Sequence, residues 1–465
     1  MVTQHGIKFA VHLITKHFGK IVAKVCENLF IHGPLTLDQL VRYTDLTKDQ
    51  VRNSLLVLVQ HNCVQAFVSA PQDDDDDADR LRVRTQYLVL FDSILHRLRF
   101  PKFLEIVSRK LDEECVKLLD GLLRDGRLTL KQMVDREKNA VPTKVVRETL
   151  CKLLTARFVE RCPAPEPVVS TSFKETTTRK RGAKSAKIFE APETLEQRVV
   201  DAAVPGDVIR FSLAADTRCS VDRETNSDDA QMISVEEEVA KEGQILWRAN
   251  FEEFIRHLRH KVLIENVRTQ HDDGTATVLS AVLEATRSVQ KKVKTENSVP
   301  LSLDTIITEV ESIVLKRYGT DGYRIFRLLA KDCCFHDTDQ IAASTLVEKK
   351  EASKLLYKLW KDNYLYMEKV GATVGAKQTT ILMWKVNKPL LWEYVLDEMY
   401  HAALNLSLRM AFEQEKDEEL LKVPKDKRQG PGPLQKKYKK LLNVWLLLGS
   451  SLMKLDDALM LFHDF

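Results

Sequence analysis

The sequence lacks the features that mark membrane and secreted proteins. No window approaches the roughly 18 uninterrupted apolar residues that a membrane span requires. The first residues, MVTQHGIKFAVHLITKHFGKIV, carry histidines and lysines throughout their apolar pattern, which indicates an amphipathic helix and not a secretory signal. The 8 cysteines form no CxxC pair. We therefore expect a reducing compartment, the cytosol or the nucleus.

A large excess of one charge is also absent. The 71 lysines and arginines nearly balance the 67 aspartates and glutamates, leaving a formal charge of +4. This balance excludes a bulk polyelectrolyte binder such as a histone, so any contact with nucleic acid must come from local patches. The composition, 44% hydrophobic and 30% charged, is typical of a protein with buried cores, and 465 residues suffice for about three domains.

Catalytic and metal-binding motifs are missing as well. The patterns GxxxxGK[ST], GxGxxG, GxSxG and HExxH do not occur. His257 and His260 lie three apart on an expected helix, but no third ligand joins them at a metal-binding spacing. The run Asp73–Asp77 lacks the central glycine and distal glutamate of a calcium loop. We expect no enzymatic activity, no metal, no cofactor and no small-molecule substrate.

What the sequence does contain is an internal repeat. Residues 33–64 read GPLTLDQLVRYTDLTKDQVRNSLLVLVQHNCV, and residues 126–159 read GRLTLKQMVDREKNAVPTKVVRETLCKLLTARFV. The openings G-x-L-T-L-x-Q-[LM]-V and the later V-R-x-[ST]-L-x-x-L recur in both copies. The offset of about 95 residues matches one small domain.

Each copy predicts three helices closed by a β-hairpin. In the first copy, helical apolar spacing runs from Gly6 to Ile31, and Thr36 with Gln39 can form a capping box for the next helix. Residues 63–68 and 81–91 have β-type patterns. Three helices with a two-stranded hairpin form a winged helix. The second copy follows the same order after a long helix that Pro101 breaks.

The same patterns divide most of the chain. We predict winged helices at 1–92, 93–164 and 309–387, a flexible polar linker at 165–245, and a C-terminal antiparallel helical hairpin or coiled coil at 388–465. The fold class is therefore mainly α with small β-hairpin wings. The hairpin seam repeats every 3.5 residues, to be filled by the preceding helix or by a partner. Its positions are Leu434, Tyr438, Leu441, Trp445, Leu448, Leu452, Leu455, Leu459 and Phe462.

The exposed faces of the third helices carry the candidate contact residues. The last winged helix has four lysines at 4-4-3 spacing, which form one stripe opposite an apolar face. Such a stripe suits backbone phosphates, but a solvated face or one that meets an acidic partner is equally expected. The candidates are Lys48, Arg52, Lys144, Arg147, Lys152, Lys350, Lys354, Lys358 and Lys361.

A second basic group lies in the expected linker. It suits nuclear import or phosphate contact, and a solvated basic loop accounts for it equally well. Its members are Arg179, Lys180, Arg181, Lys184 and Lys187.

Taken together, these units resemble a known family from the first residue to the last. The stretches HFGKIVAKV, LTLDQL, GRLTLKQMV, WRANFEEF, LLYKLW and SLMKLDDALMLFHDF are similar to those of the winged-helix subunit that heads the three-subunit initiation subcomplex of RNA polymerase III. That family is related to the alpha subunit of TFIIE. The ending LMKLDDALMLFHDF is similar to plant members in particular.

The resemblance implies a nuclear, non-catalytic subunit. Members dock on the polymerase clamp, pair with two smaller specific subunits, and help to open and hold promoter DNA. The rival interpretation is a winged-helix scaffold of the proteasome-lid or membrane-sorting type, which makes only protein contacts. The lysine stripe of the last winged helix and the basic cluster in the linker favour the polymerase.

One segment departs from the family. Residues 246–308 supply two helices and the start of a third, whereas the family has a complete third winged helix there. We expect an incomplete third winged helix. Apolar faces that include Phe254 and Leu258, and Val278 and Val282, lack the third element that would cover them. The region should be helical but incompletely folded, or packed against the neighbouring winged helix or the C-terminal hairpin.

Overall fold

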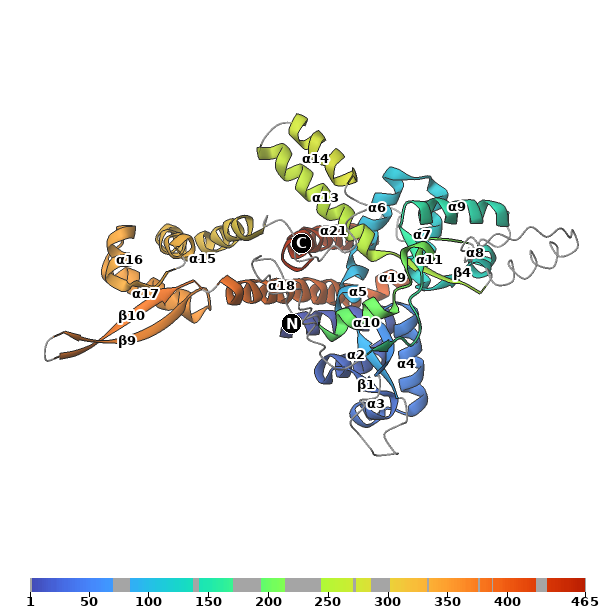
Figure 1. Ribbon diagram of the computed structural model, residues 1–465, viewed down its shortest axis with the longest axis horizontal. Coiled ribbons are helices and arrows are strands. Elements are labelled where there is room, and N and C mark those ends of the chain that lie inside the picture. The colour runs from blue at the N-terminus through green and yellow to red at the C-terminus, as the bar shows by residue number, and fades with distance from the viewer. Residues whose placement is uncertain are drawn as a thin grey trace, which may run out of the picture. The chain divides into compact units, whose positions relative to one another are not determined.

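The computed structural model describes residues 2–69, 84–136, 142–169, 194–213, 244–270, 273–285, 302–332, 334–374, 377–386, 388–423 and 433–464. It contains two compact parts, residues 10–289 and residues 1–9 with 290–465, which are taken in turn (Figure 1). As the sequence predicted, both are mainly helical with small sheets that close winged helices.

The first winged helix follows the predicted order with one difference. The expected single helix from Gly6 to Ile31 is two helices, α1 (Gln4–Phe18) and α2 (Lys20–His32), because Gly19 between them has φ +88°. Only glycine adopts that backbone conformation without strain. The other elements are β1 (Leu35–Thr36), α3 (Leu37–Thr44), α4 (Lys48–Gln60), β2 (Val64–Ser69) and β3 (Thr85–Val89).

The predicted capping box is confirmed, and it recurs. The Thr36 hydroxyl accepts the Gln39 amide, and the Gln39 side chain accepts the Thr36 amide. Thr129 with Gln132 makes the same pair of hydrogen bonds in the second winged helix. An aspartate replaces the threonine in the last unit, where Asp337 pairs with Gln340. Each second helix therefore begins in the same way, because its first orphan N–H groups are satisfied by the same local device.

The third helices also end alike. A residue with positive φ follows each of them, and the next amide donates to the carbonyl five residues back. The positive-φ residues are Asn62, Arg157 and Asn363, and the hydrogen bonds are Cys63 N to Leu58 O (2.8 Å), Phe158 N to Leu153 O (2.9 Å) and Tyr364 N to Leu359 O (2.9 Å). This shared stop turns the chain into the first strand of each wing.

The second winged helix begins with a broken helix, as Pro101 predicted. The break comprises α5 (Phe91–His96), a 3-10 turn (Arg97–Arg99) and α6 (Phe100–Lys110), with the proline in the first turn of α6. The core helices and strands follow. They are α7 (Glu113–Asp125), β4 (Leu128–Thr129), α8 (Leu130–Arg136), α9 (Thr143–Thr155) and β5 (Val159–Arg161).

The return strand of this second wing comes from far along the chain. Strand β7 (Leu246–Ala249) lies between β4 and β5 and is antiparallel to both. Trp247 and Ala249 are buried, whereas Arg248 pairs with Glu160 of β5 at 2.8 Å. We had placed residues 246–249 at the start of the incomplete third unit, and the structure instead places them in the second winged helix.

Part of the expected linker is also structured. Strand β6 (Val168–Val169) runs parallel to β2, and helix α10 (Leu195–Ala203) packs beside it. Phe67, Val169 and Val199 form one small buried cluster. Helix α11 (Asp207–Arg210) returns to β5, where Arg210 contacts the buried Glu160. This differs from a linker over all of 165–245, because these short segments cover apolar surface on the two winged helices.

Two helices occupy the region of the expected third unit. In Figure 1, α13 (Phe251–Gln270) and α14 (Asp273–Ala285) lie side by side. For α13 the alternative of packing against the neighbouring winged helix is confirmed, because the Phe254 ring stacks on Phe103 (4.7 Å) and Phe158 (4.9 Å) of the second winged helix. Val278 and Val282 on α14 are 65% and 51% exposed, as the missing cover predicted.

The last winged helix lies in the other part. Helix α15 (Ser302–Asp332) breaks at Gly319, where φ is +76°, much as Gly19 separates α1 from α2. The remaining elements are β8 (His336–Asp337), α16 (Thr338–Thr345), α17 (Lys349–Lys361), β9 (Tyr366–Val374) and β10 (Lys377–Lys385). Strands β9 and β10 pair over nine residues and extend as a long wing from α16 and α17 (Figure 1).

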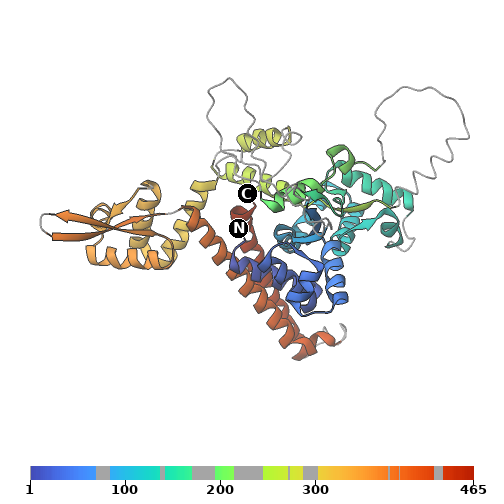
Figure 2. The ribbon, with the colours of Figure 1, turned by 60° about the horizontal axis from the view of Figure 1, so that its bottom comes forward.

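The C-terminal helical hairpin is confirmed. Helices α18 (Lys388–Lys416) and α21 (Pro433–His463) pack along each other (Figure 2), with the short α19 (Glu418–Lys422) after α18. Trp392 near the start of α18 meets Phe462 near the end of α21, so the two helices are antiparallel. Of the predicted seam, Leu441, Leu452, Leu459 and Phe462 are buried, whereas Leu434 in the first turn of α21 is 44% exposed.

Candidate nucleic-acid interface on helix α17

Helix α17 is held by one apolar side. Ala352, Leu356 and Leu359 are fully buried, and α17 contacts both α15 and α16. This burial fixes the opposite side toward solvent, because residues on one helix face recur every three or four positions. The geometry confirms the predicted division of this helix into a buried face and a charged face.

The lysine stripe lies on that outer face. Lys350, Lys354, Lys358 and Lys361 are all exposed. Lys354 forms an ion pair of 2.7 Å with Glu351, and this hydrogen bond raises the pKa of the lysine. The other three form no ion pair with any residue that the structure describes. The stripe therefore presents at least three positive charges that are available to an anionic partner.

An aromatic residue borders the stripe, and the sequence analysis missed it. Tyr357 is 57% exposed and lies three or four residues from Lys354 and Lys361. Its ring lies 5.4 Å from that of Trp360, which tilts against it at 44°. Base–aromatic stacking is a common partner of lysine–phosphate contacts. The signal was visible in the sequence, since position 357 falls at the edge of the lysine stripe, next to Lys350 and Lys361, on a helical projection.

The turn before α17 exposes an unusual leucine. Leu346 ends α16 with φ +56° and ψ +36° and is 89% exposed. The equivalent residue of the first winged helix is Asp45 with φ +52°. Aspartate tolerates the left-handed conformation, but leucine there is strained and loses its apolar surface to water. Leu346 therefore adds an apolar contact point at the entrance to α17.

The wing adds further exposed surface beside α17. Tyr366 on β9 is 46% exposed, and Val370 on β9 and Ile381 on β10 are 44% and 36% exposed. Lys385 lies over the Phe335 ring at 5.4 Å. A wing with both apolar and basic side chains can contact either a sugar–phosphate backbone or a protein surface. The wing therefore suits both kinds of partner.

The candidates on the first two winged helices are less well placed. Lys48 pairs with Asp38 at 3.6 Å, and Lys152 pairs with Asp112, whose hydrogen bond raises the pKa of the lysine. Arg52, Lys144 and Arg147 are exposed. Gln60 at the end of α4 donates its side-chain amide to the carbonyls of Asp125 (2.8 Å) and Arg127 (2.6 Å). Of the third helices, α17 therefore carries the largest set of exposed lysines without an ion pair among the described residues.

The remaining predictions concern other kinds of site. The basic cluster from Arg179 to Lys187 lies outside the described residues. His257 contacts Glu253 at 3.3 Å, and no group of three or more metal-ligating side chains occurs among the residues that the structure describes. In the same described residues, no helix combines the length and apolarity needed to cross a membrane.

The fold and the α17 face define a tandem winged-helix protein, and the sequence comparisons place it in a family. The helix-turn-helix family model of the RNA polymerase III subunit RPC82 matches twice, at residues 8–69 and 103–160, which confirms the predicted repeat. A second RPC82 model matches residues 148–314. The C-terminal winged-helix model of POLR3C matches residues 310–386.

Two of the curated relatives reported below match over most of their length. The DNA-directed RNA polymerase III subunit RPC3 of Bos taurus is 22% identical over 490 residues, which cover 90% of this chain and 86% of the relative. The corresponding subunit of Danio rerio is 23% identical with the same coverage. That of Dictyostelium discoideum is 28% identical over 181 residues, which cover 35% of this chain and 27% of the relative. The chain belongs to the RPC82/RPC3 family of RNA polymerase III subunits.

The comparisons also bear on the shortened third unit. The aligned length of 490 residues exceeds the 465 residues of this chain. The relative therefore has residues within the aligned stretch that have no counterpart here. This agrees with a shortening relative to the family, while its place at 246–308 and the similarity to plant members stay predictions.

Proposed function

We propose that this chain is a non-catalytic, nuclear subunit that docks on the RNA polymerase III core and contacts DNA through the α17 face. Membership of the RPC82/RPC3 family supports the place in the polymerase. The family resemblance extends this to docking on the clamp together with two smaller subunits. The observation that carries the DNA contact is the exposed stripe of Lys350, Lys358 and Lys361 beside Tyr357.

The chemistry of this face suits a nucleic-acid backbone. Lysine ammonium groups are compact point charges without the fork that reads a base, so they neutralise phosphates without specifying sequence. Tyr357 adds a flat ring that can stack on an exposed base or pack on a sugar. The near-balanced net charge of +4 means that DNA affinity would come from this local patch. We therefore propose weak sequence preference and strong salt dependence.

Charge reversal on α17 tests this proposal. The variant Lys350→Glu/Lys354→Glu/Lys358→Glu should bind a labelled DNA duplex more weakly and with a flatter dependence on salt. Each lysine that contacts a phosphate contributes about one unit to the slope of log K against log salt. Fluorescence anisotropy over a salt series measures this slope.

A charge-matched control comes from α15. Lys316, Arg324 and Lys331 are exposed there, and their replacement by glutamate changes the net charge equally without touching α17. The proposal requires this control to bind like the parent apart from a small nonspecific loss. If the α17 variant and the parent bind DNA with the same slope, α17 makes only protein contacts, as in the scaffold interpretation.

A further inference from the structure

The first half of α21 presents a second, separate surface. The stretch from Pro433 to Leu447 holds four lysines and no acidic residue. Leu442, Leu446 and Leu447 there are 42%, 74% and 67% exposed, although α21 already buries a different set of leucines against α18. Exposed aliphatic side chains in such a cluster mark an interaction site more often than scattered single ones do.

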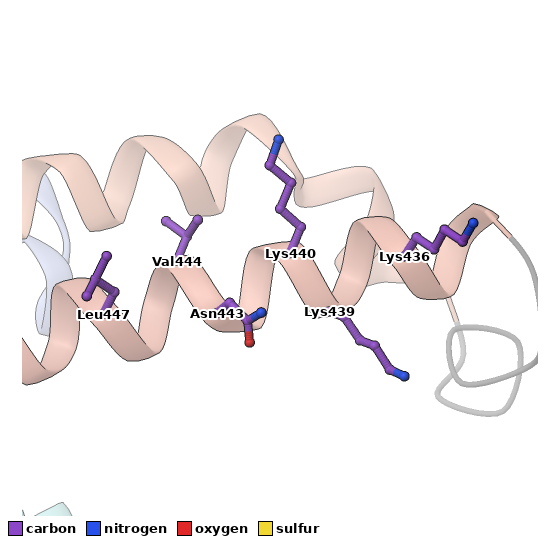
Figure 3. A pocket seen from close by; sticks show the side chains of 6 residues that line it. All are labelled: Lys436, Lys439, Lys440, Asn443, Val444 and Leu447. Carbon is purple, nitrogen blue, oxygen red and sulfur yellow. The ribbon is translucent and has the colours of Figure 1, made fainter.

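Three of the lysines share one side of the helix with Leu447. Lys436, Lys439, Lys440, Asn443, Val444 and Leu447 line an open depression of about 440 Å³. Figure 3 shows these six side chains along successive turns of α21, with Lys440 and Val444 extending to one side and Lys439 to the other. The depression thus has a basic end and an apolar end within about three helical turns.

The positive charge of this surface is not neutralised within the hairpin. Lys436, Lys437, Lys439 and Lys440 form no ion pair with any residue that the structure describes. The antiparallel arrangement places the second half of α18 beside this stretch. Glu413 there pairs with Arg409, and Glu418 pairs with Lys422 on its own helix. The second half of α18 also exposes Leu408 (47%) and Phe412 (53%).

We propose that this α21 surface, defined by Lys436, Lys439, Lys440, Leu446 and Leu447, docks an acidic amphipathic helix of a partner protein. The lysines supply charge complementarity to glutamates or aspartates, and the leucines bury the apolar stripe of the incoming helix. A nucleic acid would meet the lysines but would leave the aliphatic leucines in water, since aliphatic side chains give no flat stacking surface. This surface is independent of α17.

A site-specific photo-crosslink tests the occupant in the assembled polymerase. p-Benzoylphenylalanine at position 446 replaces a side chain that is 74% exposed, so the hairpin should tolerate it. After irradiation of the purified polymerase, the crosslinked peptide is sequenced by mass spectrometry. A segment with acidic residues and helical apolar spacing supports the proposal. A crosslink to DNA, to a basic or uncharged segment, or to nothing overturns it.

Binding of a defined probe to the purified full chain gives a second measurement. The probe is a labelled helical peptide of about four turns with leucines on one face and glutamates elsewhere. Leu446→Ser/Leu447→Ser and Lys436→Glu/Lys440→Glu should each weaken its binding by about tenfold or more, as expected for loss of an interface centre. Lys454→Glu, an exposed change in the second half of α21, should leave it unchanged. Equal binding of a scrambled peptide, or unchanged binding by both double variants, overturns the proposal.

The two proposed surfaces can be told apart in the same experiments. The triple α17 variant should bind the acidic peptide like the parent and lose only DNA affinity. The α21 variants should bind DNA like the parent chain and lose only affinity for the peptide. Loss of both ligands in either variant contradicts the separation of the two surfaces.

Discussion

Single residues in this protein carry conformations that their side chains do not favour, and Leu346 is the clearest case. A leucine in the left-handed region costs roughly 1 kcal/mol or more relative to residues that tolerate it. Its exposure of 89% gives no burial in return within the described residues. The cost of this conformation is therefore not offset by packing of Leu346 among the described residues.

Replacing Leu346 tests the strain. Leu346→Asn should raise the free energy of unfolding by about 1 kcal/mol, because asparagine tolerates the left-handed conformation. Leu346→Ala should not, since alanine keeps the conformational cost while it removes the exposed leucine. Urea denaturation of both variants measures the difference. Equal stability of the two variants would show that the backbone at position 346 is not strained.

The histidines beside Arg97 form a second residue-scale feature. Burial, followed by repulsion from the Arg97 guanidinium, lowers the pKa of both His17 and His61 to about 4, and Lys16 adds to this effect at His17. The guanidinium itself lies over the Phe18 ring at 4.6 Å, and the His61 ring lies 4.6 Å from that of Phe18. Both histidines are therefore neutral in the folded protein at neutral pH.

The lowered pKa values of His17 and His61 predict how the free energy of unfolding depends on pH. The unfolded chain binds protons at these histidines near pH 6.5, whereas the folded chain does so only near pH 4. The free energy of unfolding should therefore fall as pH falls from about 6.5 toward 4. The loss at pH 5.5 is at most about 1 kcal/mol per histidine, because partial exposure weakens the effect. His61→Phe should lose less stability over that range than the parent, as measured by urea denaturation at each pH.

At the scale of elements, sequence patterns predicted those helices whose positions and ends depend on interactions between residues close together in the chain. Capping signals and apolar spacing located the second and third helices of each winged helix, because their ends depend on hydrogen bonds within a few residues. The same reasoning missed the break at Gly19, since one glycine does not interrupt the apolar spacing on either side. Tyr357 was missed for a different reason, because only the lysines of that face were considered.

Pairing between strands that are far apart in the chain could not be predicted from such local patterns. Strand β7 pairs with β5 although more than 80 residues separate Arg161 from Leu246. The alternation of buried Trp247 and Ala249 with Arg248 indicates a strand. No nearby feature of the sequence predicts the strands with which it pairs. For the same reason, the stacking of Phe254 on Phe103 and Phe158 could not be predicted, because it depends on how α13 returns to the second winged helix.

The C-terminal hairpin allows a matched test of one element. Leu452 of α21 is 6% exposed, whereas Leu446 on the same helix is 74% exposed. Leu452→Ala should lower the free energy of unfolding of the hairpin-containing chain by roughly 2–5 kcal/mol, because it leaves a cavity in the seam. Leu446→Ala should change it by less than about 0.5 kcal/mol. Urea unfolding monitored by circular dichroism measures both values. Similar losses in the two variants would contradict the packing of Leu452 in the seam between α18 and α21.

At the scale of the whole molecule, the described residues form several separate contact surfaces on winged helices and a helical hairpin. Three winged helices share their helix starts and stops. They differ in what their third helices present, and only α17 combines several unpaired lysines with an exposed tyrosine among the described residues. The hairpin supplies a further surface on α21. Such an arrangement suits a subunit that joins polymerase, DNA and partner proteins.

Purification of the tagged full-length chain from its own cells tests the central claim most directly. We expect the core subunits of RNA polymerase III to elute with it in near-equal amounts after a wash at moderate salt, together with two smaller partners. A chain with the hairpin seam disrupted by Leu452→Ala and Leu459→Ala serves as the control for specific assembly. Recovery of the tagged chain without RNA polymerase III subunits, or equally with subunits of the other nuclear polymerases, would contradict the account.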